Sequence, residues 1–367
     1  MTAPPHPPGT TGTTDGTPVP LPAASPSSPS PPEQRGRRRV VAIDVVRGFS
    51  VVILLVAVHP GPRDGLPFHL GHPPWSGLTF ADTIFPLFLF AVGASMPFSA
   101  RASTPAKVLR RVALLTAIGI VLVTLKNREL TLPGVLQHIA VAYLLAWLVL
   151  RLPRRAQLVV GGALVAATWL AYELLHDPGV DPWGRRGTFA HLANDPFFGR
   201  FATEGVPQTI LSTINVLAGA FAGALVMRGA DARAALRRVL PWAGLYIALG
   251  LAMALVVPVN KHLWTPSFAV LTVGTSFGYF AVALWLVDVR GVRRGIRPLV
   301  VLGSNAIAVY VVTLAFGALL APTFRDLSGP LEPLGSTALT LIWSVGWLLV
   351  GLAFCEVLYR RRVFIKV

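Results

Sequence analysis

The chain has 367 residues, of which 53% are hydrophobic and only 13% are charged. This balance, together with several apolar runs near twenty residues, indicates a polytopic membrane protein. The formal net charge is +16, but the basic residues cluster in short loops between apolar runs, which argues against a nucleic-acid partner. The single cysteine, Cys355, excludes an internal disulfide and a cysteine-rich metal site, and no metal cofactor is expected.

The first 38 residues are rich in Pro, Thr, Ser and Gly and contain almost no large apolar side chain. Such a segment cannot bury enough surface to offset the entropy lost on ordering, so residues 1–38 are predicted to form a disordered cytoplasmic tail. No apolar core follows a charged start within this segment, which argues against a signal peptide. Residues 39–367 are expected to form one transmembrane domain.

The rest of the chain contains ten apolar runs, each near the length needed to cross a bilayer as a helix. The predicted fold class is therefore all-α, a polytopic integral membrane protein with about ten transmembrane helices. The predicted spans cover residues 40–58, 79–98, 109–125, 134–151, 157–175, 208–227, 239–257, 267–287, 298–320 and 336–357.

Basic residues alternate between the segments that join these spans. The six segments on the side of the N-terminus hold 23 of the 32 Lys and Arg residues, and the five opposite loops hold eight. Because Lys and Arg accumulate on the cytoplasmic side, this bias predicts two cytoplasmic termini and a multi-pass protein of the plasma (cell inner) membrane. Seven of the eight histidines lie in or beside the outer loops, where an imidazole can exchange protons near neutral pH.

The stretch from His72 to Met96 is the centre of the functional argument. It begins as a polar, proline-broken loop and continues as a span that carries a carboxylate, Asp82, one helical turn inside its start. An ionisable group at membrane depth is costly, so it is read as functional, with a partner nearby. We predict that His72 is a catalytic base and that Asp82 shapes its site. A solvated loop histidine and a structural ion pair or helix cap are the alternatives.

Six strings that carry a family resemblance occur in order between residues 40 and 320. They are Ile43–Gly48, the stretch with His72, Trp75, Gly77, Thr79 and Asp82, Pro133–Gln137, Glu204–Gly205 with Ser212–Ile214, Pro258–Trp264, and Gly303–Ala306. In this order they resemble the heparan-α-glucosaminide N-acetyltransferase family, including its bacterial members. The resemblance implies that the acetyl group of cytoplasmic acetyl-CoA is delivered to a glucosamine-like amine at the outer face. It also implies that His72 is the active-site histidine.

Two positions depart from the pattern of that family. Its members usually carry asparagine near the outer end of the first span, where this chain has His59, and often arginine where this chain has His138. Either change could alter the acceptor or the mechanism, and His59 is counted among the predicted substrate-binding residues. A histidine at the end of the first span is also a feature of the membrane acyltransferase-3 proteins, which O-acylate sugars, and in this respect the chain resembles them.

Further residues of the outer loops are predicted to complete the site. Acyl transfer to an amine needs a deprotonated amine, a polarised thioester carbonyl and fixed orientation of both. Asn260 and Lys261 are predicted to stabilise the oxyanion, and Trp264 to stack on a sugar face. Glu204 and Gln137 are further candidates for binding the acceptor. A lysine that only reaches the membrane interface is the alternative for Lys261.

The chemistry of the histidine itself stays open at this point. An imidazole can act as a general base, or as a nucleophile that forms an acetyl-histidine intermediate. Asp82 could hold its tautomer or bind the amino sugar.

Polar residues at the inner ends are predicted to bind the phosphates of CoA. These are Arg47, Arg110, Arg111 and Asn305. Asp44 and Arg47 are spaced to pair on one helix face, which is the structural alternative. The expected partners are an amino-sugar or glycan acceptor, membrane lipid and, in a homodimer, a second copy of the chain. No glycine-rich phosphate loop or GxSxG elbow occurs in the sequence.

The long outer loop, residues 176–207, carries five aromatic side chains among Gly, Pro and Asp. Loops of this length are often functional lids, and a folded cap without a substrate role is the alternative. Two other functions fit the sequence. One is an O-acyltransferase of a cell-envelope polysaccharide, and the other is a polytopic transporter, whose intramembrane polar residues would look similar.

Overall fold

The structure is a computed structural model that describes residues 1–2, 40–57, 65–99, 104–198 and 202–364. The chain divides into two units, Met1–Arg38 and Arg39–Val367. Nearly all of the predicted tail lies outside the described residues, and so does the predicted site residue His59. The disorder of the tail and the role of His59 therefore stay predictions, and everything below concerns the second unit.

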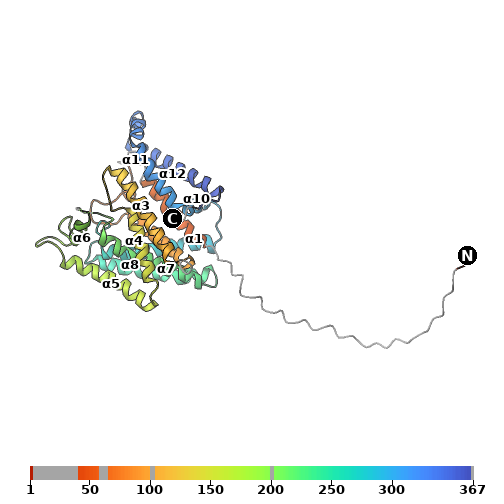
Figure 1. The fold of residues 1–367 in the computed structure, drawn as a ribbon, viewed down its shortest axis with the longest axis horizontal. Coiled ribbons are helices and arrows are strands. Elements are labelled where there is room, and N and C mark those ends of the chain that lie inside the picture. Colours follow the sequence, from red (N-terminus) through yellow and green to blue (C-terminus); the bar gives the residue numbers. More distant parts are fainter. Residues whose placement is uncertain (3–39, 58–64, 100–103, 199–201, 365–367) are drawn as a thin grey trace. The chain divides into compact units, whose positions relative to one another are not determined.

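The second unit consists of helices and loops, and no β-strand occurs within the described ranges (Figure 1). This confirms the all-α class predicted from the apolar runs. The helices are α1 (Val41–Ala57), α2 (Ile84–Ser99), α3 (Pro105–Asn127), α4 (Val135–Val149), α5 (Arg154–Leu174), α6 (Phe189–Phe198), α7 (Val206–Arg228), α8 (Ala232–Ala254), α9 (Pro266–Ala283), α10 (Arg297–Ser304), α11 (Ala306–Ser328) and α12 (Ser336–Arg360). Short helical turns cover Phe68–Leu70, Ala81–Thr83, Leu284–Val289 and Gly329–Leu334.

Every predicted span coincides with one helix or with two consecutive helices. Six of the described helices are long and apolar enough to cross a bilayer, and the pair α10–α11, bent by 76°, would add a seventh. Helices α1 and α4 are shorter, with 17 and 15 residues, and α8 carries three arginines near its start. The count of ten spans and the sides of the termini therefore stay predictions.

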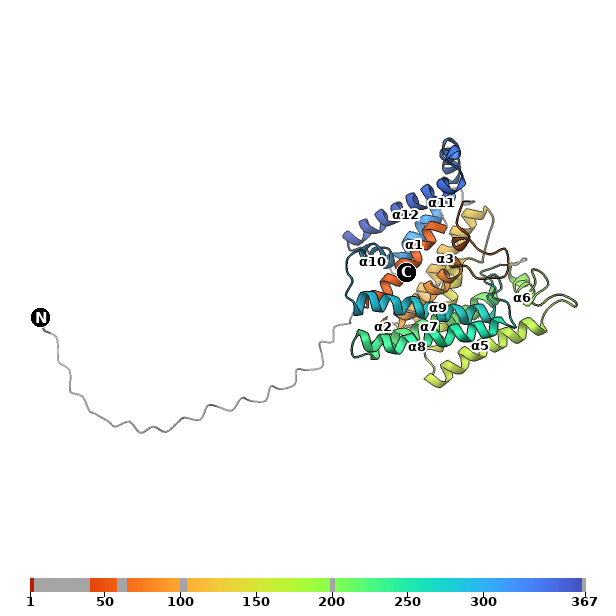
Figure 2. The same ribbon diagram turned by 180° about the vertical axis from the view of Figure 1, so that it is seen from behind.

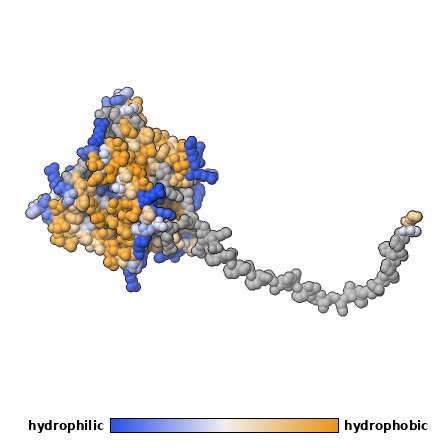
Figure 3. Space-filling model, viewed as in Figure 1, coloured by the Kyte–Doolittle hydropathy of each residue, from blue (hydrophilic) through white to orange (hydrophobic). Residues whose placement is uncertain are grey.

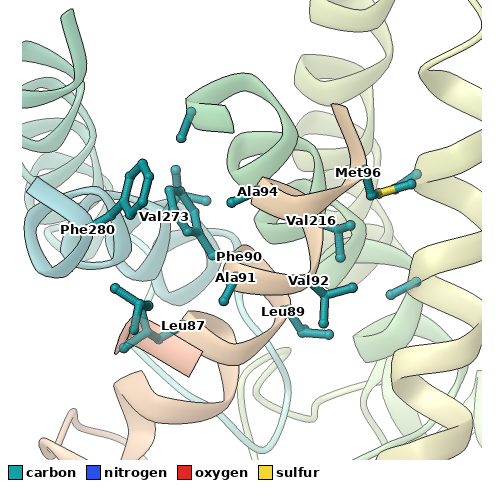
Figure 4. Packing of buried hydrophobic residues seen from close by; sticks show 14 of the residues in the cluster. Leu87, Leu89, Phe90, Ala91, Val92, Ala94, Met96, Val216, Val273 and Phe280 are labelled. Carbon is teal, nitrogen blue, oxygen red and sulfur yellow. The ribbon is translucent and has the colours of Figure 1, made fainter. Parts of the chain in front are cut away.

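Helix α2 lies at the centre of the packing, against α7 and α9. Most of its apolar side chains are buried, and Figure 4 shows Phe90 beside Val273 and Phe280 of α9. The contact with α7 is a backbone contact, since a Cβ atom added to Gly93 would lie 1.9 Å from the carbonyl oxygen of Val216. Small residues at such crossings allow helices in a membrane to pack closely.

A second close crossing joins α1 to α10. A Cβ atom added to Gly48 would lie 1.8 Å from the carbonyl oxygen of Leu299, and one added to Gly303 would lie 2.0 Å from that of Asp44. Both glycines belong to strings that carry the family resemblance, and their role here is to let two backbones meet. Helix α12 packs against both α1 and α10, and α8 lies along α9 (Figure 2).

The outer faces of several helices are apolar and exposed. Leu114 and Val121 of α3, and Leu158 and Leu170 of α5, are each more than 40% exposed. Figure 3 shows a broad hydrophobic surface with hydrophilic residues gathered toward its margins. A continuous apolar surface of this kind is what lipid would cover in a membrane protein.

Candidate functional site

The site is built on the start of α2. Asp82 lies in the helical turn Ala81–Thr83 that leads into this helix, and its side chain is fully buried. The backbone N–H and the hydroxyl of Thr79 both donate to Oδ2 of Asp82, at 3.0 Å and 2.9 Å. A carboxylate that accepts from the N–H three residues earlier caps the helix start. One oxygen of Asp82 is therefore part of the fold, which leaves Oδ1 for other contacts.

Oδ1 of Asp82 lies 2.6 Å from Nδ1 of His72, in the loop before the helix. The imidazole is 50% exposed. When Nδ1 carries the proton and donates it to the carboxylate, Nε2 is left as the proton acceptor. The two residues predicted to form the centre of the site are thus in contact, and the role of His72 as a general base stays a prediction.

Lys261 completes the cluster. Its Nζ lies 3.4 Å from Oδ1 of Asp82 and 3.4 Å from each ring nitrogen of His72. Burial lowers the pKa of Lys261 below its ordinary value, and the neighbouring Asp82 carboxylate opposes that shift. A cation so close to the imidazole can supply positive charge to a developing oxyanion, and this role of Lys261 stays a prediction.

Asn260 serves to join two loops. Its backbone N–H donates to Thr265 Oγ1 at 3.0 Å, its Oδ1 accepts from the N–H of Leu263 at 3.0 Å, and its Nδ2 donates to Ser76 Oγ at 3.4 Å. The side chain is fully buried. The amide predicted to face the oxyanion is thus engaged in holding the loop of Lys261 against the loop of His72.

Trp264 lies beneath the site and does not present a face to solvent. Its backbone has a positive φ of 51°, and the residue is 1% exposed. Its ring packs against Phe85, His138 and Phe268. The predicted stacking of Trp264 on a sugar therefore has no open ring face in this structure, and the side chain instead supports the loop from below.

Two α4 residues singled out from the sequence are also structural here. His138 is buried, and its Nε2 lies 2.6 Å from Ser212 Oγ on α7. Gln137 donates from Nε2 to the carbonyl oxygen of Leu132 at 2.9 Å. Its Oε1 packs so close to Gly119 of α3 that a Cβ atom there would lie 2.2 Å away. Neither residue lines the cavities described below.

The long outer loop packs against the site from outside. Trp75 stacks on His262, with ring centroids 5.2 Å apart, and donates from Nε1 to the carbonyl oxygen of Trp183 at 3.0 Å. Arg185 donates to the carbonyl oxygen of Pro74 at 2.9 Å. The first part of this loop is thus a folded cap fixed on the loop of His72, and its role toward a substrate stays a prediction.

A cavity of about 380 Å³ opens beside the cluster and extends between α1, α2, α4 and α11. His72 and Lys261 line it, together with Lys126 and Glu204. The rest of its wall is mostly apolar, with Ile53, Leu54, Phe88 and Ile307 among the lining residues.

A second cavity, of about 410 Å³, lies between the end of α3 and the loops that lead into α4 and α7. The five residues that the two cavities share include Lys126, Glu204 and Tyr310. Of these three, the sequence predicts a binding role only for Glu204. The signal that could have identified Lys126 is its place at the predicted outer end of a span, in the last turn of α3, where the chain has few basic residues.

The four predicted CoA-binding residues come from different parts of the fold: Arg47 lies on α1, Arg110 and Arg111 lie on α3, and Asn305 follows α10. Nη1 of Arg47 lies 3.3 Å from the carbonyl oxygen of Gly303, to which it donates, and 3.7 Å from Asp44. Asn305, at the break between α10 and α11, donates to the carbonyl oxygen of Val363 at 3.2 Å.

Arg110 and Arg111 lie instead on α3. Arg110 is exposed, and the guanidinium of Arg111 lies 4.6 Å from the ring centroid of Tyr143 on α4. The structural pair of Asp44 and Arg47 is present, and the phosphate-binding role of the four residues stays a prediction.

Comparison with known proteins confirms the resemblance found in the sequence. Residues 39–195, which include His72 and Asp82, match the family described as heparan-alpha-glucosaminide N-acetyltransferase, catalytic. The human heparan-alpha-glucosaminide N-acetyltransferase is 25% identical over 90% of this chain and 60% of its own length. The mouse protein of the same name is 24% identical over 92% of this chain and 62% of its own length. The chain thus spans about three fifths of the relatives that it matches.

Proposed function

We propose that this protein is a multi-pass membrane acetyltransferase that moves the acetyl group of cytoplasmic acetyl-CoA to the amine of a glucosamine-like acceptor at the outer face. The observation that carries the proposal is the His72–Asp82–Lys261 cluster at the edge of a cavity that extends between the helices. The similarity to two N-acetyltransferases supports the reaction type. The all-helical fold with its apolar outer surface supports a place in the membrane.

The first cavity, which His72 and Lys261 line, is suited to the thioester-bearing arm of acetyl-CoA. Its wall is mostly apolar along α1, α2, α4 and α11, whereas His72 and Lys261 supply the polar end. A thioester placed at that end would have the imidazole and the ammonium group beside it. The arginines at the predicted inner ends, Arg47, Arg110 and Arg111, with Asn305, are proposed to bind the nucleotide and phosphates of the donor.

In the proposed mechanism, His72 transfers a proton from the acceptor nitrogen to the sulfur of CoA. The acceptor ammonium group first releases one proton to solvent. The neutral nitrogen then attacks the thioester carbonyl carbon, so that a new C–N bond forms and the carbonyl π electrons move to the oxygen. Nε2 of His72 takes the second proton, which the nitrogen loses as it becomes an amide, while the buried Asp82 carboxylate stabilises the resulting imidazolium. The C–S bond then breaks, its electron pair stays on the sulfur of CoA, and the proton passes from His72 to that thiolate. Lys261 stabilises the negative oxygen of the intermediate.

A covalent route uses the same residues. Nε2 of His72 would attack the thioester carbonyl carbon itself, and the C–S bond would break with its electron pair on the sulfur of CoA. The amine would then attack the acetyl-imidazole, and the bond from the acetyl carbon to the ring would break and restore His72. Lys261 would serve the oxyanion in both steps. The two routes differ in whether acetyl label stays on the protein when no acceptor is present.

The experiment that tests the function uses purified protein in proteoliposomes with labelled acetyl-CoA. Acetyl-CoA is supplied on one side of the membrane and glucosamine on the other, with His72→Ala as the control. Release of CoA together with labelled N-acetyl product supports the proposal. Transfer only to hydroxyl acceptors would indicate the O-acyltransferase alternative. Uptake of a solute without CoA release would indicate a transporter, and either outcome would overturn the proposal.

A further inference from the structure

Glu204 faces both cavities from the loop before α7. Among the described residues that line either cavity, it is the one carboxylate. Apart from one tyrosine, the other ionisable side chains of these described lining residues carry nitrogen, namely those of Lys126, Lys261 and His72. Lys261 is already paired with Asp82 at 3.4 Å. Within the described part of the chain, no ion pair is formed by the Glu204 carboxylate itself.

The carboxyl of Glu204 is only partly exposed where it lines the two cavities. Burial raises its pKa above the ordinary value, and Lys261, a hydrogen bond from its own backbone N–H and Lys126 oppose the shift without cancelling it. A carboxylate that is partly removed from water and has no ion-pair partner loses part of its hydration. A cation bound beside it would restore that stabilisation.

We propose that Glu204 binds the ammonium group of the acceptor and thereby makes the protein select amines over hydroxyls. This inference rests on the acetyl-transfer function proposed above and assigns one substrate contact to one residue. An amino sugar and its parent sugar differ at the reacting position only by an ammonium group in place of a hydroxyl. A site with a desolvated carboxylate discriminates between them because only the ammonium group compensates its charge.

The second cavity would hold the rest of the acceptor. It adjoins Glu204, and polar side chains of Asn127, Thr131 and Thr203 line it, as suits the hydroxyls of a sugar. It lies where α3 ends and where α4 and α7 begin, which is the predicted outer side. The acceptor would thus reach the reaction through this cavity, whereas the thioester arm occupies the other.

The contact should act on binding and not on the chemical step. A carboxylate stabilises an ammonium group, but the amine must be neutral when it attacks the thioester. As the C–N bond forms, the nitrogen regains positive charge, so the interaction with Glu204 acts in the bound complex and again in the transition state. A contact of this kind lowers KM for the acceptor without raising kcat, so its removal should change KM and leave kcat close to wild type.

The test compares Glu204→Gln with wild type, using glucosamine as the acceptor and glucose as its neutral analogue. Asp195→Asn serves as the matched control, because Asp195 is an exposed carboxylate of α6 that lines neither cavity. We expect Glu204→Gln to raise KM for glucosamine about ten- to a hundredfold. KM for acetyl-CoA should stay within about twofold, as kcat should, and Asp195→Asn should leave all three unchanged.

Binding to wild-type protein gives a readout that does not depend on a variant or on turnover. Titration by calorimetry should show that glucosamine binds at least about tenfold more tightly than glucose, a preference that Glu204→Gln should abolish. Equal binding of the two sugars to wild type, or an unchanged KM in Glu204→Gln, would overturn the inference. Failure of the proposed function would show itself differently, as the absence of CoA release by wild type with every amine offered.

Discussion

Oδ1 of Asp82 lies 2.6 Å from Nδ1 of His72, so that a fully buried carboxylate meets a half-exposed imidazole at the edge of a cavity. The buried charge fixes which ring nitrogen carries the proton. The exposed side of the ring remains open to a substrate.

Replacing Asp82 by asparagine removes the charge and keeps the size of the side chain. We expect kcat to fall about 10²- to 10⁴-fold, because the imidazolium and Lys261 both lose their counter-ion. Acetyl-CoA binding should persist. Asp231→Asn is the control, since asparagine caps a helix as well as the aspartate that caps α8 does. Turnover of Asp82→Asn near the wild-type rate would exclude a catalytic pair.

Replacing His72 by alanine removes the proton acceptor and leaves the helices intact. Turnover should fall about 10²- to 10⁴-fold. A higher pH should restore part of the rate, because more of the acceptor amine is then already neutral. His69→Ala, an exposed histidine of the same loop, should be unaffected. Acetyl label that accumulates on wild-type protein without acceptor, with no rescue of the variant by pH, would instead indicate the covalent route.

Lys261→Met removes a cation that lies 3.4 Å from both nitrogens of His72. With less positive charge nearby, the base is protonated more readily as the pH falls. The acidic limb of the pH profile of kcat/KM should therefore move to higher pH, and kcat should also fall through the loss of oxyanion stabilisation. Lys107→Met, an exposed lysine of α3, is the control. An acidic limb that moved to lower pH would contradict the assignment.

Gly303→Ala tests the crossing of α1 and α10. The added Cβ atom would lie 2.0 Å from the carbonyl oxygen of Asp44, so the two helices must separate. We expect a destabilisation of about 1–3 kcal/mol or more and a lower Tm in detergent. Gly346→Ala on α12 is the matched control, because a Cβ atom there meets no atom within 4 Å. Its Tm should be unchanged or slightly higher. An equal response of both variants would refute the crossing.

The predicted topology is tested by cysteine labelling. In a Cys355→Ala background, Ser76→Cys lies in the loop of His72 and Ala230→Cys lies in the turn between α7 and α8, both exposed. An impermeant thiol reagent should label only Ser76→Cys in intact cells, and both after permeabilisation. The reversed pattern would place His72 on the cytoplasmic side and would invert the proposed direction of transfer.

Much of the site could be predicted from the sequence because its signals are local. Asp82 stands out as a carboxylate inside an apolar run, and His72 precedes it in the adjoining loop. The structure also shows that Asp82 accepts from the backbone N–H and the hydroxyl of Thr79, three residues earlier, which is a contact of the kind expected from the helix-cap alternative. Lys261 came from the family resemblance, because nothing local ties a loop after α8 to the start of α2.

The roles of Trp264, Asn260 and Gln137 could not be predicted, because each depends on tertiary packing. Residue type suggested that a loop tryptophan would be open to a sugar, yet a positive φ turns Trp264 into the protein, between Phe85 and Phe268. The polar groups of Asn260 form hydrogen bonds that hold two loops together. Likewise, helices α1 and α4 were recognised with nearly correct bounds, but their lengths alone do not establish that they cross the membrane.

The double hydrogen bond from Thr79 to Oδ2 of Asp82 has a consequence for how the site can be regulated. The carboxylate is oriented before any substrate arrives, so the protein needs no rearrangement to present it to His72. The same bonds begin a helix that lies at the centre of the packing. Turning the carboxylate away would break both of these bonds at the turn that leads into α2. His72 belongs to the outer loop, so a movement of that loop would switch the base off by drawing the imidazole away from a carboxylate that stays in place.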